Sequence, residues 1–397
     1  MSQIYKINHL TLNNNNTQFC MSFNNGIKTF NAEDFQEKYS STTLGNISFS
    51  AILHELNMVI FVGSENNELY NNKKVVIYDL INQKDIYSTR FKNEITGLKI
   101  INKFLIISFN KELTIFSLEK KDILIPLKEI IIEDSDLFEF WDFSENGIIP
   151  LLKLYFAYET KNGINIESYI GNELNLAKKE EIKKPVAKIQ NIFYIKKINQ
   201  ILLPDEKAFY IYGINPDDGK QMLCLYRGKY PGYITSMTLL NKTFLAVNNL
   251  NRTIHIFDIS NNNNNFNIGN MIGGFIYGSY ISPVIRIPYD KITKDNKDGE
   301  FYENDFQKKG ALLASEDEGI ELKIYAYNGY AYKVRINFLK KDFEVIIKEK
   351  FAKFKVYENN ESSVGETDSG LYNYNSIFEQ DKKDKKEKKE EKYVVVE

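Results

Sequence analysis

Histidines and cysteines at short spacings are the usual sign of metal or nucleophilic chemistry. The three histidines are His9, His54 and His255, and none has a second histidine three or four residues away, as a zinc site of the HExxH kind requires. The two cysteines, Cys20 and Cys224, form no CxxC pair. The sequence also lacks GxGxxG, Walker and GxSxG motifs. We therefore expect no catalytic residues, no metal and no cofactor. A catalytic loop on a fold that does not dictate function is the alternative.

Composition limits the partners and the compartment. The 397 residues carry a formal net charge of −2, so no overall basic field attracts nucleic acid. Aromatic residues fall in strand patterns rather than among basic clusters, which also argues against nucleic acid. The first residues have no apolar signal region, and no stretch approaches the ~18 apolar residues of a membrane span. Two cysteines argue against a disulfide framework. We expect a cytoplasmic protein that meets membranes only peripherally.

Short strand patterns separated by turn residues recur along nearly the whole chain. The clearest hairpin places Asn328-Gly329 between Lys323–Tyr327 and Tyr330–Ile336, because Asn-Gly accepts the positive φ of a tight turn. Similar runs are typical of the third strand of successive four-stranded units: Ile27–Phe30, Val75–Asp79, Leu113–Leu118, Tyr210–Tyr212, Thr253–Asp258 and Tyr330–Ile336. A spacing of ~40–50 residues per unit is typical of propeller blades. The sequence thus predicts an all-β, seven-bladed, WD-repeat-like β-propeller over residues 1–357.

Two parts of the chain fit this rhythm poorly. For the fourth unit we expect strands at Ile130–Ile132, Leu151–Tyr158 and Ile164–Tyr169, with Asp134–Asn146 as a loop that carries the only tryptophan, Trp141. From Glu358 the strand pattern ends, and the chain mixes Lys, Glu and Asp with no apolar stripe. We expect residues 358–397 to be a disordered or partly helical charged tail.

One stretch indicates a function. It runs Leu225-Tyr226-Arg227-Gly228, then Ser236, Asn248-Asn249 and Thr253-Ile254-His255-Ile256-Phe257. This stretch resembles the PROPPIN family, the WD-repeat-like propellers of WIPI type that bind phosphoinositides. In that family a blade ends in Phe-Arg-Arg-Gly, and the next blade carries a Ser-bearing strand and a Thr-x-His-x-Phe strand. Further segments agree in order, so that the likeness spans most of residues 15–340: Asn16–Asn31, Lys74–Asp79, Arg90–Leu98 and Asn328–Lys333.

The resemblance implies two pockets at the ring edge for phosphatidylinositol 3-phosphate or its 3,5-bisphosphate, each using one arginine of the pair. In the second pocket the implied lipid-binding residues are Arg227, Gly228, Ser236, Asn248, Thr253 and His255. A guanidinium fork matches phosphate oxygens, and hydroxyl, amide and imidazole groups complete such a cage. The first pocket is degenerate, since Tyr226 and Tyr210 stand where arginines are expected and Lys207 is its one obvious cation. The alternative is that Arg227 is a solvated residue beside a turn and His255 is structural.

The family also carries a membrane-inserting loop between the last two strands of its sixth blade. The matching apolar residues, before a strand at Val284–Ile287, are Met271, Ile272, Phe275, Ile276 and Tyr277. Burial of each large apolar side chain would contribute ~1.5–3 kcal/mol, and stable anchoring takes two such signals. The alternative is that Phe275–Ile281 packs against the blade as its fourth strand.

Together these features predict a peripheral-membrane phosphoinositide effector, expected to be a monomer on endosomal, vacuolar or preautophagosomal membranes. It would recruit autophagy or trafficking proteins such as a lipid-transfer partner. The loop that the family uses for that partner corresponds to Gly63–Lys73, which lacks the Pro-rich character of the family. The alternative, favoured by Tyr226, is a lipid-independent propeller scaffold for protein–protein interaction.

Overall fold

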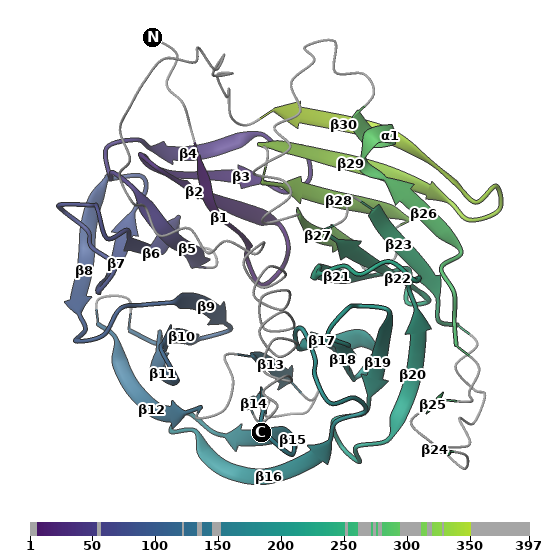
Figure 1. Cartoon of the computed structure of the whole chain (residues 1–397). Helices are drawn as coiled ribbons and strands as arrows, with labels where there is room; N and C mark the ends of the chain where they lie inside the picture. The colour runs from purple at the N-terminus through teal and green to yellow at the C-terminus, as the bar shows by residue number, and fades with distance from the viewer. Residues whose placement is uncertain are drawn as a thin grey trace, which may run out of the picture. The chain divides into compact units, whose positions relative to one another are not determined.

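The computed structural model describes residues 6–53, 57–120, 123–132, 137–144, 152–250, 253–260, 271–272, 275–276, 280–293, 311–315, 320–327 and 329–350. Over these ranges the chain forms seven four-stranded antiparallel sheets, arranged as blades around one axis (Figure 1). The seven-bladed propeller expected from the sequence is therefore confirmed. The expected tail, residues 358–397, lies outside the described ranges.

Each blade uses strands that are consecutive in sequence, except the sixth, into which a short hairpin is inserted. Blades 1 to 3 are β1 (Ile7–Leu12), β2 (Gln18–Phe23), β3 (Gly26–Asn31), β4 (Glu37–Ser41); β5 (Ile47–Leu53), β6 (Met58–Gly63), β7 (Lys74–Asp79), β8 (Lys84–Arg90); and β9 (Gly97–Ile101), β10 (Phe104–Phe109), β11 (Glu112–Ser117), β12 (Ile125–Ile131). Blades 4 and 5 are β13 (Phe138–Ser144), β14 (Leu152–Glu159), β15 (Gly163–Ile170), β16 (Asn175–Lys183); and β17 (Phe193–Ile195), β18 (Gln200–Pro204), β19 (Tyr210–Ile214), β20 (Gln221–Tyr226), with a 3-10 turn, η1 (Lys196–Ile198).

Blade 6 is β21 (Ile234–Leu240), β22 (Phe244–Asn249), β23 (Thr253–Asp258) and β26 (Ile285–Pro288), with the hairpin β24 (Met271–Ile272) and β25 (Phe275–Ile276) between its last two strands. The helix α1 (Tyr289–Thr293) follows, and blade 7 is β27 (Ala311–Ser315), β28 (Glu321–Ala326), β29 (Tyr330–Asn337) and β30 (Asp342–Lys350). All the runs expected to be third strands occupy that position in their blades, as β3, β7, β11, β19, β23 and β29.

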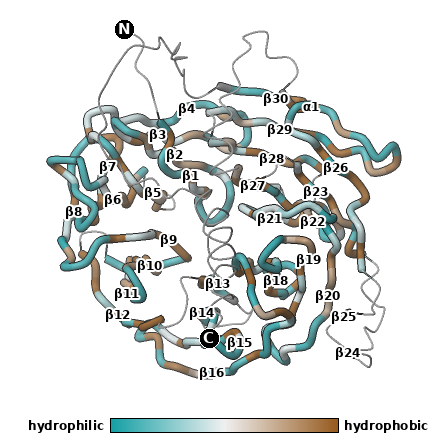
Figure 2. Tube along the Cα trace, in the orientation of Figure 1, coloured by the Kyte–Doolittle hydropathy of each residue, from teal (hydrophilic) through white to brown (hydrophobic). Residues whose placement is uncertain are grey.

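The hydrophobic core is divided among the boundaries between neighbouring blades. Successive side chains of a strand point to opposite faces of its sheet, so each blade sends one set of apolar residues to each neighbour. In blade 6, Val247 and Phe257 pack with blade 5, whereas Ala246 and Ile256 pack with blade 7. Outer strands such as β4 and β8 are more hydrophilic (Figure 2). Because the apolar side chains on both faces of a blade are covered by its two neighbours, a single blade cannot bury both faces alone, and the ring must close.

Tight turns join the strands as the sequence indicates. The hairpin expected around Asn328-Gly329 is confirmed, because β28 pairs antiparallel with β29 and Gly329 has a φ of +84°. Asn328 itself lies outside the described residues. Between β2 and β3, Gly26 has a φ of +154°, and a Cβ there would lie 1.9 Å from the carbonyl oxygen of Ser41. Only glycine fits that turn without a shift of the backbone.

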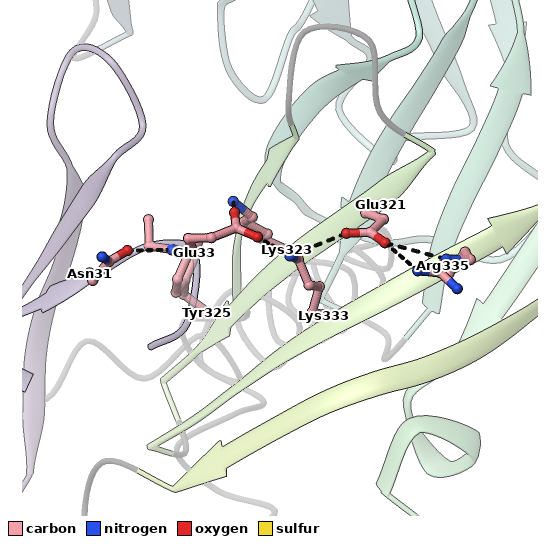
Figure 3. Close-up of polar contacts among 8 residues, drawn as sticks. Asn31, Glu33, Glu321, Lys323, Tyr325, Lys333 and Arg335 are labelled. Carbon is pink, nitrogen blue, oxygen red and sulfur yellow. Dashed lines mark hydrogen bonds and ion pairs between the residues drawn. The ribbon is translucent and has the colours of Figure 1, made fainter. Parts of the chain in front are cut away.

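Blades 1 and 7 close the ring through side chains, since each is formed by its own end of the described chain. Lys323 Nζ lies 2.6 Å from Glu33 Oε2, and Lys333 pairs with the other oxygen of Glu33 (Figure 3). Lys333 also lies 3.2 Å from Glu321 Oε2, and Arg335 Nη2 lies 2.8 Å from Glu321 Oε1. Glu33 follows β3 of blade 1 and the other four residues belong to blade 7, so this ion-pair network spans the closure.

The expectation for the fourth blade was wrong in two respects. Ile130 belongs to β12 of blade 3, and Trp141 lies in β13 rather than in a loop. Trp141 is buried and stacks on Tyr155 and Tyr194, with ring centroids 5.4 and 4.3 Å apart. The acidic residues around Trp141 give its strand a loop-like composition. They are compatible with a strand because Lys99 and Lys196 of neighbouring blades pair with Glu139 and Asp142.

Candidate functional site

The boundary between blades 5 and 6 holds three of the residues expected to bind a headgroup, Arg227, Thr253 and His255. Arg227 directly follows β20, the outer strand of blade 5, and its backbone N–H donates to the carbonyl of Phe209. Its side chain is 4% exposed. Nε donates to the carbonyl of Ala208 at 2.6 Å, and Nη2 donates to the carbonyl of Tyr230. A guanidinium has five N–H donors, so three remain beyond these two contacts.

Two side chains of blade 6 complete a basic cluster with Arg227. His255 on β23 and Arg286 on β26 are directly opposite in the register, so they share one face of the blade. That face carries Val247 and Phe257, which pack against blade 5. His255 is 5% exposed, whereas Arg286 is exposed. Arg227, His255 and Arg286 are called the basic cluster below.

The electrostatics of the basic cluster favour an anion. Burial, followed by the charges of Arg227 and Arg286, lowers the pKa of His255 to about 3, so its imidazole is neutral at pH 7. His255 Nδ1 is buried and has no hydrogen-bond partner among the described residues. Burial also lowers the pKa of Arg227, partly offset by Asp205. The carboxylate of Asp205 already accepts the backbone N–H groups of Lys207, Phe209 and Tyr210. Two guanidinium groups at one imidazole are an arrangement that a phosphate would stabilise.

Arg286 was missed by sequence reasoning. Nothing around it distinguishes it from a solvated residue on an edge strand, and 30 residues separate it from the position opposite in the register, His255. The signal that could have found it is strand pairing. If β26 is taken as the fourth strand after the insertion, the alternation of side chains along paired strands places Arg286 on the same face as His255 and Thr253.

Two expected site residues lie on the other face of blade 6. Ser236 Oγ donates to the carbonyl of Ala311 in blade 7 at 2.7 Å. Asn248 Nδ2 donates to the same carbonyl at 3.0 Å, and Asn248 Oδ1 accepts from the hydroxyl of Tyr289 at 2.8 Å. Asn248 is fully buried there. The structure therefore brings neither Ser236 nor Asn248 together with Arg227, and both join blade 6 to blade 7.

The remaining residues of the expected pocket lie on the side of the basic cluster. Thr253 is half-buried, two residues from His255 on the same face of β23, and opposite Asn249. Asn249 is buried, and its Oδ1 accepts from the backbone N–H of Tyr233 at 3.1 Å. Gly228 has a φ of +145°, and a Cβ added there would meet no atom within 4 Å. Its glycine therefore serves the turn of the chain after Arg227 rather than a close approach.

Two of the residues expected to belong to a degenerate first pocket are tyrosines that pack together. Tyr226 and Tyr210 are opposite each other in the register, with ring centroids 5.1 Å apart, and the ring of Tyr280 lies 5.0 Å from that of Tyr226. Tyr226 and Arg227 are consecutive, so their side chains leave the strand toward opposite faces. Lys207 is exposed and lines a neighbouring cleft of about 390 Å³ together with Lys188, Asp205 and Glu206. Charges of both signs line this cleft.

The insertion of blade 6 is described only in part. Its fourth strand is β26, so the alternative that Phe275–Ile281 provides that strand was wrong. Phe275-Ile276 instead pairs with Met271-Ile272 as a two-stranded hairpin, while Tyr277 lies outside the described residues. Ile281 forms a parallel bridge with Leu225 at the outer edge of blade 5.

Other expectations concern absences and a partner loop. Among the described residues, no group of three or more His, Cys, Asp or Glu side chains could hold a metal ion. No helix within the same ranges is long and apolar enough to cross a membrane. Gly63–Lys73 connects β6 to β7, and it exposes Leu69 while Asn67 Oδ1 accepts the backbone N–H of Leu69 and Tyr70.

Comparison with known proteins supports the fold. No protein-family model matches the chain. The chain is similar to Hsv2 of Kluyveromyces marxianus, with a TM-score of 0.65 and 15% identity over 88% of this chain and 100% of that one. It is also similar to Kluyveromyces lactis Hsv2, with a TM-score of 0.64 and 15% identity over 87% and 99%. KlAtg21, solved as a complex with the coiled-coil of AgAtg16, matches with a TM-score of 0.64 and 14% identity over 87% and 99%. The chain therefore has the seven-bladed propeller fold of the PROPPIN proteins Hsv2 and Atg21.

Proposed function

We propose that this protein is a peripheral-membrane protein that binds the headgroup of phosphatidylinositol 3-phosphate, or of its 3,5-bisphosphate, at the boundary of blades 5 and 6. It acts as a non-catalytic effector that recruits autophagy or trafficking proteins. The observation that carries the proposal is the basic cluster. Arg227, His255 and Arg286 converge from two blades, and no described carboxylate forms an ion pair with either guanidinium. Arg286 and Thr253 would meet the phosphate first, since they are less buried than Arg227 and His255.

The comparisons support this proposal at the level of the fold. A propeller of the same fold has been solved with a coiled-coil partner, KlAtg21 with AgAtg16, which is a precedent for protein recruitment. Solved structures of the same fold also include KlHsv2 with loop 6CD replaced by a Gly-Ser linker. In this chain, too, an insertion connects the last two strands of blade 6, β23 and β26, which pair with each other.

Co-sedimentation with vesicles tests the headgroup site. Wild type and Arg286→Gln are incubated with phosphatidylcholine vesicles that contain or lack phosphatidylinositol 3-phosphate. Arg286 is exposed, so its replacement leaves the fold intact. A charge-assisted hydrogen bond contributes ~1.5–3 kcal/mol, so we expect Arg286→Gln to weaken binding to the 3-phosphorylated vesicles about tenfold or more.

Two further variants complete the design. Arg227→Ala should lower binding at least as much, and its unfolding midpoint must be measured in parallel because Arg227 also donates to Ala208 and Tyr230. Arg90→Gln is the matched control, since Arg90 is an exposed arginine at the end of β8 in blade 2. Equal, lipid-independent binding by wild type, Arg227→Ala and Arg286→Gln would reject the proposal.

A lipid-independent scaffold is the second candidate function. It is favoured by one observation, the packing of the rings of Tyr210, Tyr226 and Tyr280, two of which were expected to belong to the first pocket. This candidate predicts that wild type does not sediment with either vesicle. It would then be tested by capture of a coiled-coil partner of the kind bound by KlAtg21.

A further inference from the structure

The rim of blade 5 exposes tyrosines beside the basic cluster. Tyr280 is 52% exposed, and its ring packs on that of half-buried Tyr226. Tyr230 is 70% exposed, and its carbonyl accepts a hydrogen bond from the Arg227 guanidinium. These three residues, Tyr226, Tyr230 and Tyr280, are called the rim tyrosines. The contact between the rings of Tyr226 and Tyr280 makes part of this rim a shared aromatic surface, and contiguous apolar surface is typical of interaction sites.

The segment that carries Tyr280 is fixed to blade 5 although it belongs to the insertion of blade 6. The backbone N–H of Tyr226 donates to Ile281 at 2.9 Å, and the N–H of Ile281 donates to Cys224 at 3.0 Å. At its other end the insertion leaves blade 6, where the N–H of Ile259 donates to Thr243 at 2.7 Å. The two described ends of the insertion therefore lie on neighbouring blades, Ile259 on blade 6 and Ile281 along the outer strand of blade 5.

This arrangement ties Tyr280 to whatever surface the insertion meets. Tyr280 lies only four positions after Ile276 of the hairpin, a chain distance of at most ~14 Å. The hairpin and Tyr280 can thus contact one extended surface at the same time. A lipid bilayer is such a surface, and tyrosine prefers its interface because the ring is apolar and the hydroxyl is polar.

The charges near the rim tyrosines select an anionic surface. Lys207, Lys229 and Arg286 are exposed, and none forms an ion pair with a carboxylate among the described residues. The nearby Asp205 accepts three backbone N–H groups, and Glu206 pairs with Lys188 at 3.1 Å. The exposed Lys207, Lys229 and Arg286 outnumber the two carboxylates named here, and Lys229 Nζ lies over the Tyr230 ring, 5.7 Å from its centroid. This excess of positive charge favours negatively charged lipid at the rim.

We propose that the rim tyrosines contact the lipid–water interface and supply membrane affinity where the first headgroup pocket is absent. The inference rests on the proposed function, in which the basic cluster binds the headgroup. The two contributions differ in kind. The basic cluster discriminates between headgroups, whereas tyrosines at the interface strengthen binding to any vesicle of the same charge.

The test compares vesicles of phosphatidylcholine and phosphatidylserine with and without phosphatidylinositol 3-phosphate. We expect Tyr230→Ala combined with Tyr280→Ala to lower the partition coefficient about tenfold on both vesicles, leaving the ratio between them unchanged. Arg286→Gln should lower that ratio instead. Ile131→Ala is the matched control, since Ile131 is 70% exposed on β12 at the outer edge of blade 3.

A spectroscopic readout separates contact from a structural role. Trp141 is the single tryptophan of the chain and is 6% exposed, so its emission should not change with vesicles. Tyr280→Trp should keep membrane binding and show a blue-shifted emission that brominated lipids quench. A purely structural tyrosine would show no such shift.

The outcomes distinguish the two proposals. If wild type prefers the 3-phosphorylated vesicle, Arg286→Gln removes the preference, and the tyrosine variants match Ile131→Ala, the rim-tyrosine inference is wrong while the proposed function stands. If the tyrosine variants lower binding but neither wild type nor Arg286→Gln discriminates between vesicles, the headgroup site is wrong and the interfacial contact stands. Absence of wild-type binding to either vesicle overturns both.

Discussion

Acidification should destabilise this protein through His255, and the size of the effect follows from its surroundings. The imidazole is 5% exposed and faces two guanidinium groups, so the folded protein resists its protonation. Its pKa falls from an ordinary value of 6.5 to about 3. Between these two values the unfolded chain binds a proton that the folded protein does not. Stability therefore falls as the pH drops from about 6.5 toward 3.

The expected magnitude depends mainly on the unfolded pKa of 6.5. Lowering the pH from 7 to about 5 should reduce the free energy of unfolding by about 2 kcal/mol through His255 alone. The same figure holds for any folded pKa below about 4, because the folded imidazole then stays neutral at about pH 5. His255→Phe keeps a planar apolar ring at this site and removes the titration. The His255→Phe variant should therefore lack this part of the loss of stability between pH 7 and pH 5.

Urea unfolding at pH 7 and pH 5 measures this contribution as a difference between wild type and His255→Phe. Other titrating groups cancel in the comparison. His9→Phe is the control, since it removes a histidine of blade 1 that accepts the Ser50 N–H at Nδ1 and leaves the basic cluster intact. If wild type and His255→Phe lose equal stability between pH 7 and pH 5, the imidazole is not held neutral by burial and the two arginines.

Two further predictions concern the contacts between blades. Glu33→Gln should lower the free energy of unfolding by about 1–2 kcal/mol, because Lys323 and Lys333 are buried beside it, whereas Asp218→Asn in an exposed ion pair should change it little. Equal effects of these two variants in urea unfolding would refute the closure role of Glu33. Asn248→Ala removes hydrogen bonds to Thr235 and Ala311 and from Tyr289. This variant should lower the free energy of unfolding in urea by about 2–3 kcal/mol, and the folded protein should still prefer the 3-phosphorylated vesicle. Loss of that preference would show that Asn248 does contribute to the headgroup site.

The fold was predictable because its signals are local. Short runs of apolar residues mark strands such as Lys74–Asp79, which is buried on both faces of its blade, and turn residues mark their ends, as at Gly26 and Gly329. The same local rules failed in the fourth blade. The strand around Trp141 contains acidic residues, and two of them, Glu139 and Asp142, form ion pairs with Lys99 and Lys196 from neighbouring blades. The ion-pair partners of these acidic residues lie far away in the sequence, so local patterns could not identify this strand.

The candidate site was predictable in part. Thr253 and His255 are two residues apart on one strand, so a shared face follows from sequence alone. The opposite directions of Tyr226 and Arg227 follow in the same way. Whether Ser236 and Asn248 join that face depends on the register between three strands, with an irregularity between Ile234 and Ser236. The register turns both residues toward Ala311.

By itself, the sequence determined the repeated strand pattern, the residues that alternate within each strand and the arginine that follows β20. Those properties depend on neighbours a few residues away. Only the tertiary structure decided that Arg286 faces His255, that Tyr280 packs on Tyr226 and that Glu33 joins blade 1 to blade 7. Each of these pairs joins segments that are far apart in sequence. Their contact is fixed by strand register and by closure of the ring, because a blade can bury its second face only against its neighbour.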